Sequence, residues 1–77
     1  MIKIEIFGTG CTSCRKTEAH IRNMVAELDL DAEIVKVEDM DEITERGIML
    51  TPAVAVDGEI KVSGTVPPET EIIKWFE

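Results

Sequence analysis

The chain contains two cysteines, which lie three positions apart in the stretch Gly8-Thr9-Gly10-Cys11-Thr12-Ser13-Cys14. This stretch stands between an apolar run of β type and a long helical pattern. Side chains three positions apart at the start of a helix lie about 5–6 Å apart at Cβ, so a small local adjustment brings two sulfurs to bonding distance. The pair can therefore form and break a disulfide without a change of fold.

The two cysteines are expected to differ in exposure and therefore in role. Cys11 precedes the helix, where unpaired N–H groups and the helix dipole favour a thiolate, and Arg15 and Lys16 add positive charge. Cys14 falls on the apolar stripe of the same helix and is expected to be buried. We therefore predict two catalytic residues, with Cys11 as the attacking nucleophile and Cys14 as the resolving thiol.

Metal binding is the alternative chemistry for two close cysteines. Two thiolates suit a soft ion such as Cu(I), whereas a closed zinc site takes four ligands and the chain has no third cysteine. His20 lies six positions beyond Cys14, off its helix face, and we expect it to be a solvated side chain. Redox chemistry is the leading hypothesis, a soft-metal-binding module or metallochaperone is the alternative, and no metal ligand is assigned.

Size and charge narrow the possible functions. A chain of 77 residues with 44% hydrophobic and 31% charged residues should form one globular domain, 1–77. Eight basic against 16 acidic residues give a net charge of −8, which argues against nucleic acid and anionic membranes as partners. No apolar run approaches the roughly 18 residues of a membrane span. We expect a soluble, cytoplasmic monomer.

Hydrophobic periodicity predicts a strand, a helix and a second strand in the first half of the chain. Residues 2–7 alternate with period two, and residues 12–28 carry apolar side chains at spacings of three and four. Residues 32–37 are again rich in β-branched side chains. Such a βαβ unit makes the two strands parallel, joined by a right-handed crossover.

A short helix is predicted over residues 39–46. Asp39 is its expected N-terminal cap, and Gly47 is its expected stop. Met40 and Ile43 are expected to form its buried side.

A hairpin and a last helix complete the predicted order βαβαββα. Asp57-Gly58 is a strong turn signal between strands over residues 53–56 and 59–62. Pro67-Pro68 can open the last helix, in which Trp75 is expected to pack against the core rather than to bind a partner.

The cysteine stretch after the first strand, Thr51-Pro52 before a hairpin and the closing helix together resemble the thioredoxin superfamily in its short, glutaredoxin-like form. The chain looks most like the small redox-active disulfide proteins of archaea and bacteria. The resemblance implies an α/β fold with a four-stranded mixed sheet, helices on both faces, and a cis Thr51–Pro52 bond beside the cysteines. It also implies that substrate contacts come from Gly10, Thr12, Ser13, Thr51 and Pro52.

Glu5 stands six positions before Cys11, where thioredoxins carry a buried acid that helps to deprotonate the resolving thiol. A buried carboxylate is costly unless it is protonated or paired. We expect Glu5 to reach the end of the sheet, where it is solvated or pairs with Lys3 or Lys61, rather than to transfer a proton.

The sequence also departs from both named families. Thioredoxins have Trp before the first cysteine and Gly-Pro between the two, whereas Gly10 and Thr12-Ser13 stand here. Glutaredoxins have a Gly-Gly-acidic glutathione site after the hairpin, whereas Ser63-Gly64-Thr65 stands here. Use of glutathione is therefore not expected.

The sequence thus predicts a thiol–disulfide oxidoreductase that reduces protein disulfides through a Cys11–Cys14 disulfide and needs no other cofactor. The expected partners are disulfide-containing protein substrates and an electron donor, either a thioredoxin-reductase-like flavoenzyme or another dithiol.

Overall fold

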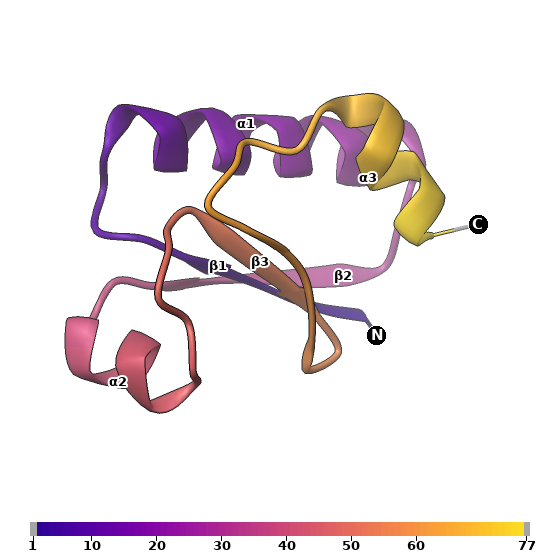
Figure 1. Cartoon of the computed structure of the whole chain (residues 1–77). Helices are drawn as coiled ribbons and strands as arrows, with labels where there is room; N and C mark the ends of the chain where they lie inside the picture. The colour runs from indigo at the N-terminus through magenta and orange to yellow at the C-terminus, as the bar shows by residue number, and fades with distance from the viewer. Residues whose placement is uncertain (1, 77) are drawn as a thin grey trace.

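Figure 1 shows the computed structural model of the chain, which describes residues 2–76. The elements follow in the predicted order βαβαββα. They are β1 (Ile2–Phe7), α1 (Thr12–Glu27), β2 (Ala32–Val37), α2 (Met40–Glu45), β3 (Ala53–Val56), β4 (Glu59–Ser63) and α3 (Glu69–Trp75).

The strands form one mixed sheet in the order β2-β1-β3-β4. β1 pairs with β2 in parallel, as the βαβ pattern predicts, and with β3 in the antiparallel sense. Helices α1 and α3 cover one face of the sheet and α2 covers the other (Figure 1). The α/β thioredoxin-like architecture that the resemblance implies is therefore confirmed.

Central strand β1 supplies side chains to two separate apolar cores, because successive residues of a strand point to opposite faces. Ile4 and Ile6 join the core under α1 and α3. Phe7 joins the smaller core under α2, which also contains Ile43 and Ile48. Both faces of β1 are thus buried, and side chains on one face do not contact those on the other.

Helix α1 begins at the cysteine motif, with Cys11 as its N-cap residue. The predicted stripe is buried at Cys14, Thr17, Ile21 and Met24. Leu28, which the stripe includes, is instead 39% exposed because the helix ends at Glu27 and Asp29 turns the chain with a φ of 51°. In the described residues 2–76, no helix has the length and apolarity to cross a membrane.

Helix α2 has the predicted caps but a different buried side. The Asp39 carboxylate accepts hydrogen bonds from two backbone N–H groups of the first turn, and Gly47 ends the helix with a φ of 78°. Ile43 is buried, but Met40 is 57% exposed, so the expectation that both face the core is wrong for Met40. The reason is that Ile48, whose N–H donates to the Ile43 carbonyl, folds back to fill this core.

The hairpin and last helix agree with prediction. Asp57 and Gly58 both have positive φ, 51° and 88°, as the tight turn requires. Pro68 precedes α3. The side chain of Ile72, in this helix, is fully buried. Trp75 packs, partly buried, against the same core.

Replacing Ile72 by Ala tests how far the fold depends on the docking of α3. We expect Ile72→Ala to lower the free energy of unfolding by about 2–5 kcal/mol, because it leaves a cavity at a fully buried position. The matched control Ile60→Ala, at a position 44% exposed, should cost about 1 kcal/mol or less. Urea unfolding followed by circular dichroism measures both, and equal losses would contradict this description of the core.

Candidate functional site

Cys11 and Cys14 are joined by a disulfide at the N-terminus of α1, with their Cα atoms 5.1 Å apart. The spacing that suggested the bond therefore brings the two residues together in the fold. Cys11 is exposed, whereas Cys14 is only 6% exposed. This is the asymmetry expected from the position of each residue relative to the helix stripe.

The start of α1 favours negative charge on the Cys11 sulfur. The backbone N–H of Cys14 donates to Cys11 Sγ at 3.2 Å, so the sulfur occupies the N-cap acceptor position. The first turn of α1, all within the described part of the chain, has no acidic residue, and Arg15 and Lys16 follow at once. These features stabilise a thiolate on Cys11 once the disulfide is reduced.

The second site segment meets the cysteine motif at the end of β1. The register pairs Phe7 with Ala53, which sets Pro52 beside Gly8, the first residue after the strand. The Thr51–Pro52 bond is cis, as the resemblance implies. Two segments that are far apart in the sequence therefore lie at one end of the sheet.

Backbone hydrogen bonds hold these segments in place. The Gly8 N–H donates to the Val37 carbonyl at 3.0 Å on the β2 side. The Gly64 N–H donates to the Pro52 carbonyl at 2.9 Å on the β4 side. Gly8 thus extends the pairing of β1 with β2, and Gly64 extends the pairing of β3 with β4, each by one residue.

The predicted substrate-binding residues lie on these two segments. Gly10, with a φ of 86°, and Thr12 and Ser13 of the first helical turn are exposed, as is Thr51, whereas Pro52 is buried. Their contacts with a substrate remain a prediction.

Gly8 has a role that the sequence pattern did not indicate. A Cβ built on Gly8 would overlap the Cys14 Sγ and lie 3.0 Å from the Cys14 Cβ. Glycine is therefore needed at this position for the close approach of the sulfur to the backbone, not only to end the strand.

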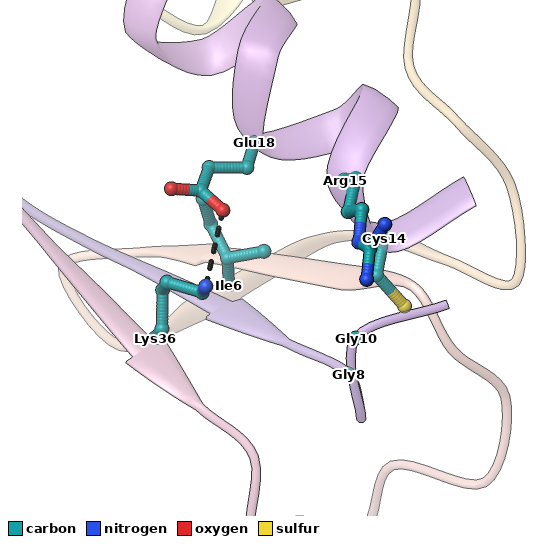
Figure 2. Close-up of a pocket in the computed structure, with 7 residues that line it drawn as sticks. All are labelled: Ile6, Gly8, Gly10, Cys14, Arg15, Glu18 and Lys36. Carbon is teal, nitrogen blue, oxygen red and sulfur yellow. Dashed lines mark ion pairs between the residues drawn. The ribbon is translucent and has the colours of Figure 1, made fainter. Parts of the chain in front are cut away.

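A small pocket lies beside the buried cysteine (Figure 2). The charged residues on its walls are Arg15, which the sequence already connected with the site, and Glu18 of α1 and Lys36 of β2, which it did not. Its lining residues are Ile6, Gly8, Gly10, Cys14, Arg15, Glu18 and Lys36.

Glu5 lies on the opposite face of β1 and is 7% exposed. Its carboxylate accepts two hydrogen bonds from Arg46, at 2.9 and 3.0 Å, and the Arg46 guanidinium lies 5.1 Å from the centre of the Phe7 ring. The expectation of solvation or of pairing with Lys3 or Lys61 was therefore wrong. Arg46 comes from the end of α2, 41 positions away, and no local pattern connects it with Glu5.

The bond to Arg46 has an electrostatic consequence for Glu5. The hydrogen bond from the guanidinium holds the pKa of the Glu5 carboxyl below its ordinary value, outweighing the opposing effect of burial. Glu5 is thus a charged structural group at neutral pH.

His20 is also not the solvated side chain expected from the sequence. It is partly buried, and its Nδ1 lies 3.0 Å from the Pro67 carbonyl oxygen. Because a carbonyl only accepts, Nδ1 must carry the proton. His20 therefore ties α1 to the segment before α3 and takes no part in the cysteine site.

Residues 2–77 match the model of the thioredoxin domain. The chain belongs to the thioredoxin family. It is 47% identical over 74 residues to a thioredoxin of Methanothermobacter thermautotrophicus, with 96% of each chain covered. It is also 47% identical over 72 residues to a thioredoxin of Methanocaldococcus jannaschii, covering 94% of this chain and 83% of that one.

Membership of the thioredoxin family and the cysteine pair together identify a thiol–disulfide oxidoreductase. They do not favour the metal-binding alternative. Within residues 2–76, no three His, Cys, Asp or Glu side chains gather as a metal site would require.

The contact between Gly8 and Cys14 can be tested in the reduced protein. We expect Gly8→Ala to lower the free energy of unfolding by about 1–3 kcal/mol, because the new methyl group overlaps the Cys14 sulfur. In the Cys14→Ala background the same change should cost less, since the sulfur is gone. Urea unfolding of the four proteins under reducing conditions gives the coupling, and an equal cost in both backgrounds would show that the contact is not the cause.

The ion pair of Glu5 should make stability depend on pH in a defined direction. Because the folded-state pKa of Glu5 is lowered, its contribution is complete above the pKa of an unfolded glutamate, about 4.3, and is lost as the pH falls through the folded-state value. The stability of the wild type relative to Glu5→Gln should therefore be level near neutral pH and decline in acid. Denaturation at a series of pH values measures this difference.

Two further variants complete that experiment. Arg46→Met should destabilise the protein at pH 7, because it leaves a buried carboxylate unpaired, and acidification should recover part of the loss. Glu33→Gln, at an exposed position of edge strand β2, should leave the pH dependence unchanged. A difference between wild type and Glu5→Gln that stays constant into acid would refute a stabilising role for the pair.

Proposed function

We propose that this thioredoxin-family chain reduces disulfides in other proteins, with Cys11 as the attacking thiol and Cys14 as the resolving thiol. The observation that carries the proposal is the unequal exposure of two cysteines within bonding distance. Only the sulfur of Cys11 is accessible to a large substrate. The buried sulfur of Cys14 can reach the sulfur of Cys11.

The reaction has two exchange steps. The Cys11 thiolate attacks one sulfur of the substrate disulfide, forming a mixed disulfide and releasing the other substrate sulfur as a thiolate. The sulfur of Cys14 then attacks Cys11 Sγ, which forms the Cys11–Cys14 bond and releases the second substrate sulfur. Two electrons pass to the substrate, and each released thiolate takes up a proton.

The position of the disulfide at the end of the sheet, next to the loop before β3, supports an assignment of substrate contacts. An extended segment of the substrate would lie across the end of the sheet, between the cysteine motif and the loop before β3. The residues that we propose to contact it are Gly10, Thr12, Ser13, Thr51 and Pro52.

The oxidised protein must be reduced again by a two-electron donor. We propose a thioredoxin-reductase-like flavoenzyme or another dithiol, and no cofactor of the chain itself beyond the disulfide. The net charge of −8 supports protein partners over nucleic acid or anionic membranes. We place this activity in the cytoplasm and assign it to a monomer with a single domain over residues 1–77.

Serine variants of the two cysteines separate the two roles. We expect Cys11→Ser to lose disulfide reduction, because no nucleophile is exposed to the substrate. Cys14→Ser should still attack but accumulate mixed disulfides with the substrate, because nothing releases them. Turnover is measured as dithiol-dependent reduction of a protein disulfide, and trapped adducts are measured by mass spectrometry.

The two serine variants control for each other, because each loses the disulfide and gains the same hydroxyl. The reverse assignment, with adducts at Cys14 of Cys11→Ser, would overturn the proposed roles. Wild-type turnover in both variants would overturn the proposed reaction.

A further inference from the structure

Resolution of the mixed disulfide requires the thiol of Cys14 to lose its proton. This thiol is 6% exposed, and burial away from water disfavours a thiolate. A proton acceptor that reaches Cys14 from inside the protein would therefore speed this step.

Glu5 does not meet this requirement. It points to the α2 face of β1, whereas Ile6, the next residue, points to the α1 face and lines the pocket beside Cys14. Both oxygens of Glu5 are also taken by Arg46. The acidic residue that lines the Cys14 pocket is Glu18.

Glu18 stands on the same face of α1 as Cys14, four positions later. Two cations hold its carboxylate at the pocket. Arg22 Nε donates at 2.8 Å from the next turn of α1, and Lys36 Nζ lies 3.3 Å away on β2. The Glu18 side chain is 21% exposed, so it lies largely inside the surface.

Figure 2 shows the Glu18–Lys36 pair on one side of the pocket and Cys14, with Arg15, on the other. The pocket between them has a volume of about 20 Å³. This is enough for one water molecule, which needs about 10–15 Å³ and polar partners. A water-mediated transfer of a proton from the thiol to the carboxylate would pass through this pocket.

We propose that Glu18 accepts the proton of Cys14 through this pocket during resolution and then releases it to solvent. The inference rests on the proposed function. As Cys14 Sγ attacks Cys11 Sγ, the bond from Cys11 to the substrate breaks, the electron pair leaves on the substrate sulfur, and the proton of Cys14 passes to Glu18. Glu18 is thus a proton acceptor for the resolving thiol, not a ligand of the substrate.

The charges around Glu18 keep its carboxyl ionised. The hydrogen bond from Arg22, together with that from Lys36, holds the pKa of the Glu18 carboxyl below its ordinary value despite partial desolvation. Arg15 adds positive charge from α1, and Glu38 binds the far side of Lys36 at 3.5 Å. Glu18 is therefore ionised across the neutral and mildly acidic range, and its capacity to accept a proton does not change there.

The test is the rate of resolution at different pH values in Glu18→Gln. Reduced protein is mixed with excess of an aromatic disulfide whose released thiolate is coloured, which gives a bimolecular phase for Cys11 and then a concentration-independent phase for Cys14. The wild-type second phase should be level in mildly acidic solution. In Glu18→Gln it should be about 100-fold slower there and rise about tenfold per pH unit, because only thiolate formed by solvent then reacts.

Three variants distinguish proton acceptance from a structural role. Glu18→Asp should restore much of the level profile, because it restores a carboxylate. Lys36→Met should slow the second phase less than Glu18→Gln and keep it level, because the acceptor remains. Glu38→Gln, an exposed partner of Lys36 outside the pocket, should behave like the wild type.

The inference is overturned if Glu18→Gln keeps the wild-type second phase at each pH, or if Lys36→Met reproduces the full effect of Glu18→Gln. Failure of the proposed function gives a different result, since the bimolecular phase of Cys11 would then be missing from the wild type itself.

Discussion

The close approach of the Cys14 sulfur to the backbone of Gly8 is the constraint on which the site depends. It brings the first turn of α1 directly onto the end of β1, so that Cys14 is buried while Cys11, one turn earlier, remains at the surface. A side chain at position 8 would push the helix start away from the sheet. This contact lets Cys14 pack at the buried end of the helix stripe, whereas Cys11 precedes the stripe and stays exposed.

Central strand β1 separates two ion pairs, Glu5 with Arg46 and Glu18 with Lys36. On its α2 face, Glu5 and Arg46 form a bidentate pair over the Phe7 ring, and this pair satisfies a carboxylate that burial alone would disfavour. On its α1 face, Glu18 and Lys36 border the pocket of the resolving thiol. Glu5, which stabilises the fold, and Glu18, which lines the pocket of the resolving thiol, therefore lie on different sides of the same strand.

Much of the fold could be predicted because the decisive interactions are local. The N-terminal cap by Asp39, the turn at Asp57-Gly58 and the disulfide of Cys11 and Cys14 each join residues at most three positions apart. The errors lie where packing from elsewhere decides. Met40 is exposed because Ile48 fills the core in its place, and Leu28 is exposed because the chain turns away at Asp29.

The sequence by itself determined the order of the elements, the parallel pairing of β1 with β2, the antiparallel pairing of β3 with β4 and the position of the reactive cysteines, since periodicity and turn chemistry act over a few residues. Only the tertiary structure decided which partners the isolated charges find. Glu5 meets Arg46 across 41 positions, and His20 meets Pro67 across 47. Such pairs depend on how helices are placed against the sheet, and that placement is set by the sum of many weak apolar contacts rather than by any local pattern.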